Sequence, residues 1–227
     1  MMSKMKLLAL IRVWLLVLLS LSLPAAAEDT LWTTTLAQAK ASKQLVAADI
    51  DIVVTYERDP LRPVHFRSHL SGWEKGNPVY STMEVDPLPG ASRGKGQSIV
   101  NMMHAIVDMA GEIPEPGAKV SRSDGQALDG KTWTVFQQSE SGVGRKMASK
   151  IWVETETGCI HQVDTDLHVA LYVDGRMKIS YAADTKGRCL PRQIDANIDF
   201  IIPFKKMKIK MKQTASNWVV RPVASTP

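Results

Sequence analysis

Residues 151–162 read Ile-Trp-Val-Glu-Thr-Glu-Thr-Gly-Cys-Ile-His-Gln, and this stretch decides the fold class. Short runs of β-branched and aromatic residues stand at both ends, which is typical of strands. Between them, Thr155 to Gly158 has the small and polar residues that turns prefer. The stretch therefore predicts a strand, a turn and the start of a second strand.

The same pattern extends in both directions along the chain. Apolar runs of strand length alternate with turn residues such as Asp124-Gly125, Asp129-Gly130 and Asp174-Gly175. The predicted strands cover residues 51–57, 64–73, 79–85, 131–138, 145–154, 159–163, 167–173, 177–182, 194–200, 204–211 and 218–220. Two helices are predicted, from Asp29 or Thr30 to about Ala47 and from Gln97 to Ala110, because their apolar residues follow a helical period.

Residues 1–27 have the features of a secretory signal peptide. Lys4, Lys6 and Arg12 precede an apolar run, which ends at Pro24 and the small residues Ala25 to Ala27. We expect cleavage after Ala27, with residues 28–227 forming a single domain in the periplasm. The alternative is an uncleaved membrane anchor, for which the apolar run is short.

Composition and charge exclude several classes of protein. With 44% hydrophobic and 22% charged residues, the chain is too apolar for a disordered protein. The net charge of +5 falls to +2 without the leader, because the leader contains three basic residues and no acidic ones. A nearly neutral domain gives no general electrostatic reason to bind nucleic acid.

The two cysteines predict a disulfide between Cys159 and Cys189. A hairpin with a two-residue turn at Asp174-Gly175 would pair residues whose numbers add to 349, and the cysteines add to 348. One bulge or a three-residue turn would place them opposite each other. The alternative is a redox-active thiol, which the absence of a C-x-x-C pattern disfavours.

The sequence contains no motif that predicts an enzyme, a metal site or a cofactor. It has no G-x-S-x-G or H-E-x-x-H pattern. His65 and His69 would stand about 13 Å apart on a strand, too far to share one metal ion. The loop from Gly90 to Gly96 lacks the spacing of a phosphate-binding loop, although Arg93 and Lys95 could meet an anionic group.

Residues 205–212 read Lys-Lys-Met-Lys-Ile-Lys-Met-Lys. On a strand the even-numbered lysines lie on one face and the apolar residues on the other. The lysines are either an ordinary solvated face or a basic docking face for an anionic surface. This docking face consists of Lys206, Lys208, Lys210 and Lys212.

Large apolar residues on the predicted helices and strands are candidates for a ligand cavity. Methionine suits irregular apolar space, although the same residues could equally fill an ordinary core. The candidate lining residues are Leu31, Trp32, Met102, Met103, Ile106, Met109, Trp133, Trp152, Met207, Ile209 and Met211.

The order of these elements resembles the LolA/LolB family of periplasmic lipoprotein carriers. The local similarity is strongest at Lys131 to Phe136, Ile151 to Gln162 and Leu190 to Ile194. The resemblance implies a mainly β (α+β) fold, a curved, open antiparallel β-barrel of about eleven strands covered by two helices. It also implies a non-enzymatic, monomeric carrier of a lipid or an acylated protein, acting in envelope lipid or lipoprotein trafficking with an envelope transporter or membrane surface. The alternative is an envelope interaction module with a filled core, docking through residues 205–212.

Overall fold

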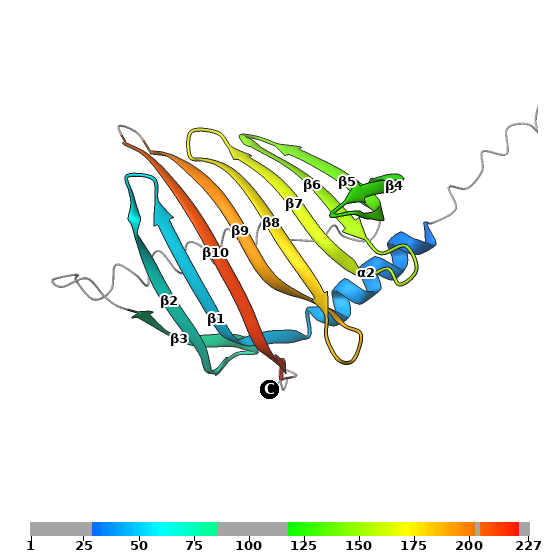
Figure 1. Ribbon diagram of the computed structural model, residues 1–227, viewed down its shortest axis with the longest axis horizontal. Helices are drawn as coiled ribbons and strands as arrows, with labels where there is room; N and C mark the ends of the chain where they lie inside the picture. The colour runs from blue at the N-terminus through cyan, green and yellow to red at the C-terminus, as the bar shows by residue number, and fades with distance from the viewer. Residues whose placement is uncertain (1–28, 86–117, 203–204, 223–227) are drawn as a thin grey trace, which may run out of the picture. The chain divides into compact units, whose positions relative to one another are not determined.

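The computed structural model describes residues 29–85, 118–202 and 205–222, and these form one helix and ten strands. Figure 1 shows the strands side by side in a single sheet. The elements are α2 (Thr30–Ser42), β1 (Leu45–Tyr56), β2 (Asp59–Glu74), β3 (Asn77–Val85), β4 (Ser121–Leu128), β5 (Lys131–Gly142), β6 (Arg145–Val153), β7 (Ile160–Val169), β8 (Val173–Ala183), β9 (Cys189–Ile202) and β10 (Lys205–Val220).

All neighbouring strands are antiparallel, in the order β3-β2-β1-β10-β9-β8-β7-β6-β5-β4. Strands β1 to β3 form one meander and β4 to β10 form another. The two are joined by the pairing of β1 with β10, which runs from Leu45 opposite Val220 to Tyr56 opposite Ile209. The mainly β fold is confirmed. The described sheet is open, with β3 and β4 at its edges, so the predicted barrel covered by two helices is not confirmed.

Several strand boundaries differ from the prediction. The predicted strand 159–163 and the first three residues of 167–173 belong to one strand, β7, apart from Cys159, and residues 205–211 and 218–220 both belong to β10. Strand β4 replaces the turn predicted at Asp124-Gly125. There the register shifts between Ser123 and Gln126, and Gly125 has φ +66°, so the Asp-Gly pair forms a bulge within a strand.

The turn between β7 and β8 lies at residues 170–172, so the prediction of a turn at Asp174-Gly175 was wrong. Val169 is opposite Val173, and the N–H of Tyr172 donates to the carbonyl of Val169. Leu171 adopts φ +68°, a conformation that normally favours glycine. Asp174 and Gly175 instead pair with both β7 and β9.

Helix α2 ends at Ser42, five residues before the predicted end. Trp32, Thr35 and Ala39 are buried at a spacing that places them on one face of the helix. Leu45 to Ala47 are instead the first residues of β1, and they pair with the end of β10. Local apolar periodicity predicted a longer helix because this pairing partner lies more than 170 residues away. The second predicted helix, Gln97 to Ala110, lies outside the described residues.

The predicted disulfide between Cys159 and Cys189 is confirmed, with a Cα–Cα distance of 5.8 Å. The predicted hairpin register was wrong, since β7 and β8 pair residues whose numbers add to 342. Cys159 precedes β7 and Cys189 begins β9, so the bond joins strands on either side of β8. Disulfides are typical of proteins in oxidising compartments outside the cytoplasm.

Candidate functional site

One face of the sheet, here called the inner face, is apolar over eight adjacent strands from β2 to β5. Residues that alternate along each strand contribute to it, as expected for a sheet with one buried face. Its central members include Ile52, Phe136, Ile151 and Ile209, each at most 2% exposed. The inner face carries Ile50, Ile52, Val54, Phe66, Phe136, Ile151, Val153, Val163, Met177, Ile179, Ile194, Ala196, Ile198, Phe200, Ile209 and Met211.

Helix α2 contacts one end of the inner face. The Trp32 ring packs against Phe136 with 4.7 Å between centroids. Gln38 Nε2 donates to the carbonyl of Thr157 over 2.6 Å, and Ser42 Oγ donates to the carbonyl of Cys189 over 2.8 Å. Thr157 lies in the turn before β7 and Cys189 begins β9, so the helix is anchored close to where these strands begin (Figure 1).

The far end of the inner face contains a row of directly opposed residues on five strands. Met147, Leu167, Gly175, Ile198 and Ile209 follow one another across β6, β7, β8, β9 and β10. Leu167 is eight residues along the chain from Cys159, a distance of about 25 Å on an extended strand. This row therefore lies well away from the contacts of α2.

Gly175 leaves a small apolar hollow in this row. The hollow has a volume of about 10 Å³, and Leu167, Met177 and Ile198 are among its lining residues. A Cβ atom at Gly175 would meet Asn197 O at 3.7 Å and Ile198 Cγ1 at 3.8 Å, which are ordinary contact distances. A Cβ atom would fit here, so steric crowding at this position does not require a glycine.

Some side-chain polar atoms of the described residues are buried without a hydrogen-bond partner. They include Oε1 of Gln213 and Nε of Arg145, together with Nε1 of Trp218 and Nε of Arg221. Gln213 continues the inner-face alternation of β10 after Ile209 and Met211 and is 6% exposed. Burial without a hydrogen bond costs free energy, so the atoms of Gln213 and Arg145 are polar groups suited to interact with a ligand on this face.

The opposite face of the sheet, here called the outer face, is polar and carries charges of alternating sign. Lys212, Asp195, Lys178, Asp164 and Lys150 are directly opposed across β10, β9, β8, β7 and β6. Opposite charges on neighbouring strands stabilise the pairing. The outer face is therefore largely neutralised by its own side chains.

The strand at 205–212 places its lysines in this pattern. Lys208, Lys210 and Lys212 are exposed on the outer face, while the side chain of Lys206 lies outside the described residues. Lys208 Nζ is 3.6 Å from Glu57 Oε1 and 4.0 Å from Asp199 Oδ2. The predicted basic docking face is therefore interleaved with carboxylates. The sequence pattern alone did not predict that these carboxylates lie beside the lysines.

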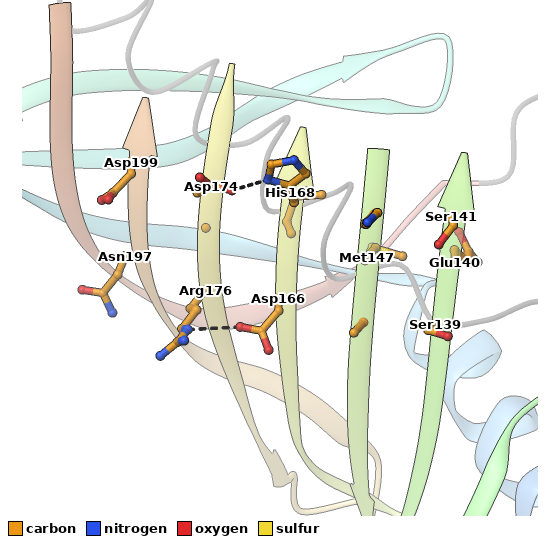
Figure 2. A pocket seen from close by; sticks show the side chains of 14 residues that line it. Ser139, Glu140, Ser141, Met147, Asp166, His168, Asp174, Arg176, Asn197 and Asp199 are labelled. Atoms are coloured by element: carbon orange, nitrogen blue, oxygen red, sulfur yellow. Dashed lines mark hydrogen bonds and ion pairs between the residues drawn. The ribbon is translucent and has the colours of Figure 1, made fainter. Parts of the chain in front are cut away.

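A groove on the outer face has a volume of about 710 Å³ and is lined by residues of β5 to β9. Figure 2 shows side chains that line it. His168 Nδ1 hydrogen-bonds to Asp174 Oδ1, and Arg176 Nε lies 3.2 Å from Asp166 Oδ1. Ser141 is separated from His168 by the strand that carries Lys146, a gap of about 10 Å. The histidine and this serine therefore do not form a nucleophile–base pair.

Hydrogen bonds lower the pKa of a carboxyl on the outer face. Asn217 Nδ2 donates to Asp49 Oδ2 over 2.5 Å, and His69 Nδ1 lies 2.6 Å from Asp49 Oδ1. Both contacts favour the ionised carboxylate and lower the pKa of Asp49. This cluster joins β1, β2 and β10. Within the described ranges, no three His, Cys, Asp or Glu side chains come together in a group that could hold a metal ion.

The structure brings together part of the predicted cavity lining. Trp32, Ile209 and Met211 belong to the buried cluster, and Leu31 and Met207 pack against it. The structure separates two tryptophans from this set. Trp152 donates its indole N–H to Asp164 on the outer face over 2.7 Å. Trp133 stacks on His161 with 4.1 Å between ring centroids. The remaining predicted lining residues, Met102, Met103, Ile106 and Met109, lie outside the described residues.

Comparison with known proteins found no matching family model, no matching curated protein and no matching solved structure. In the parts of the chain that the structure describes, no helix is both long and apolar enough to cross a membrane.

Proposed function

We propose that the protein is a periplasmic, non-enzymatic carrier that holds acyl chains against the inner face of its sheet. The observation that supports this proposal most strongly is the continuous apolar inner face, which extends over eight strands while the contacts of α2 lie at one end. Burial of an acyl chain there would contribute about 0.8 kcal/mol for each methylene group removed from water.

The proposed location and partners follow from the leader and the disulfide. A cleaved signal peptide would deliver the chain to an oxidising compartment, where the bond between Cys159 and Cys189 persists. The cargo would be a lipid or an acylated protein, received from or delivered to an envelope transporter or membrane surface. The carrier would act as a monomer.

Lipid analysis after purification from the periplasm tests this proposal. The purified protein should contain lipids detectable by mass spectrometry after solvent extraction, and delipidated protein should bind a fluorescent fatty acid that unlabelled palmitate displaces. Gly175→Leu should weaken this binding by filling the hollow, while Lys210→Ala on the outer face should leave it unchanged.

A folded protein that contains no lipid and binds no fatty acid would contradict the proposal. If such a protein instead loses a protein partner when Lys210 and Lys212 are replaced by alanine, the result would support an interaction module that docks through residues 205–212.

A further inference from the structure

We infer that Arg145 binds the anionic head group of a single-chain amphiphile whose tail lies across the hollow at Gly175. This inference rests on the proposed function and narrows it to a class of ligand. Its two parts are the unpartnered guanidinium nitrogen of Arg145 and the missing side chain in the apolar row two strands away.

Arg145 begins β6 and projects onto the inner face. It is two residues before Met147, so the two side chains share a face of the strand. Arg145 Nη2 lies 3.8 Å from Met147 Sδ, which confirms that the guanidinium lies along this face. Met147 is 6% exposed, and Arg145 is half-buried with its Nε inaccessible to solvent.

Arg145 has no carboxylate partner, unlike four other described arginines. Four arginines lie within 3.2 Å of an aspartate oxygen, forming the pairs Arg67–Asp51, Arg122–Asp124, Arg176–Asp166 and Arg188–Asp184. The acidic residue of β5 nearest in register, Glu140, accepts a hydrogen bond from Gln138. Among the ion pairs of the described residues, none includes Arg145.

A guanidinium whose Nε is buried without a hydrogen-bond partner is unfavourable, and a bidentate oxyanion is its best partner. A carboxylate or phosphate at this position would satisfy Nε together with a terminal nitrogen. The anion would arrive with an apolar tail because the surface beside Arg145 is apolar. Met147 is followed across the sheet by Leu167 and then by Gly175.

The hollow lies within reach of an acyl chain that starts at Arg145. The distance along the strand from Arg145 to Met147 is about 7 Å, and the distance from Met147 to Gly175 across two strand spacings is about 10 Å. The tail would pass over Leu167 and across the hollow beside Ile198, whose volume of about 10 Å³ has room for a single methyl or methylene group. Head group and tail therefore have separate contacts, which separate substitutions can remove.

The test compares ligands of equal chain length and different head groups. Affinities of full-length mature protein for palmitate, a palmitoyl lysophospholipid with a phosphate head group, uncharged monopalmitin and inorganic phosphate would be measured by calorimetry or by displacement of a fluorescent fatty acid. Wild-type protein should bind the two anionic amphiphiles at least about tenfold more tightly than monopalmitin, because charge-assisted hydrogen bonds are strong. Inorganic phosphate alone should not compete.

Two variants and a matched control separate the contributions. Arg145→Met should reduce affinity for the anionic amphiphiles to that for monopalmitin and leave monopalmitin binding unchanged. Gly175→Leu should weaken the binding of all three amphiphiles. Lys178→Gln, at an exposed position on the outer face of the same strand, should change none of them. Circular dichroism would confirm that each variant is folded.

The outcomes distinguish this inference from the proposed function. Equal affinity of wild-type protein for charged and uncharged amphiphiles, or an unchanged preference in Arg145→Met, would overturn the head-group assignment and leave acyl-chain binding intact. Binding of inorganic phosphate as tightly as palmitate would also overturn it, by showing a site for a free anion. If wild-type protein binds none of the amphiphiles, both proposals fail.

Discussion

Cys159 and Cys189 are joined by a disulfide with 5.8 Å between their Cα atoms, although β8 separates the strands at whose starts they stand. The bond closes a loop of 30 residues that contains all of β7 and β8. It also lies at the end of the sheet where Ser42 anchors α2 to the carbonyl of Cys189. The disulfide therefore fixes the strand ends to which the helix is attached.

Removal of this bond should destabilise the fold. Replacing both cysteines by alanine should lower the free energy of unfolding by about 3–4 kcal/mol, the contribution expected from closing a loop of this length in the unfolded chain. Urea denaturation followed by tryptophan fluorescence measures the effect. Wild-type protein with a reducing agent is the control, and it should unfold at a midpoint close to that of the variant. Equal midpoints for oxidised and reduced protein would contradict the prediction.

Gly158 should be much less tolerant of alanine than Gly187. Both glycines have positive φ, +72° and +73°, so alanine at either costs about 1–2 kcal/mol in backbone strain. A Cβ at Gly158 would also lie 2.9 Å from Thr34 Cγ2 of α2, whereas Gly187 has no heavy atom within 4 Å of that position. The additional loss of unfolding free energy in Gly158→Ala, compared with Gly187→Ala, should be about 1–3 kcal/mol.

Denaturant unfolding of Gly158→Ala and Gly187→Ala, measured side by side, separates the cost of the close contact with α2 from the cost of backbone strain. Equal losses of stability in the two variants would show that Thr34 moves aside without cost and that the contact between α2 and this turn is loose.

Truncation of two neighbouring residues on β10 should change the stability of the protein by very different amounts. Ile209 is 2% exposed on the inner face, so Ile209→Ala should cost about 2–5 kcal/mol through lost burial and the cavity that remains. Lys210 is exposed on the outer face, so Lys210→Ala should change stability by less than about 0.5 kcal/mol. Thermal or urea unfolding checks both, and a large loss in Lys210→Ala would contradict the assignment of faces.

Asp184 should make stability depend on pH below about 4. Its carboxylate accepts hydrogen bonds from Arg188 Nε and from the backbone N–H groups of Arg188 and Lys186. These contacts, the side-chain bond from Arg188 first, lower its pKa from 3.8 to about 2. Since the folded pKa lies below the unfolded one, the stabilisation is complete above the unfolded value and is lost as the pH falls toward 2.

Asp184→Asn should therefore be less stable than wild type at pH 5, and the difference should disappear near pH 2. Urea midpoints across this pH range, with an NMR titration of the Asp184 carboxyl, measure both quantities. A difference between the two proteins that is constant over the whole range would contradict a role for the charge.

Local sequence patterns predicted what depends on neighbours along the chain. The alternation at Ile209 and Met211 correctly placed both on a buried strand face. The end of α2 was missed because Leu45 to Ala47 are held in a strand by β10, from the other end of the chain. The turn at residues 170–172 was missed because Leu171 adopts a conformation that its residue type disfavours, while the Asp-Gly pair stays inside β8.

Candidate site residues were harder to predict because their roles depend on register between strands. The lysines of β10 were visible in the sequence, but the carboxylates of Asp195 and Asp199 beside them follow only from the pairing of β9 with β10. Gln213 could have been found by extending the alternation of Ile209 and Met211. No local pattern indicates that Arg145 lacks an acidic partner, since that depends on every strand around it.

The pairing of β1 with β10 also has a consequence during synthesis of the chain. Strands β1 to β3 are made first, but among the described strands they attach to the rest of the sheet only through β10, the last of these strands to leave the ribosome. Until β10 is available, the first meander has no edge to join, and the sheet cannot be completed early. A chain with this connectivity therefore completes its native sheet only after its C-terminal strand has been synthesised.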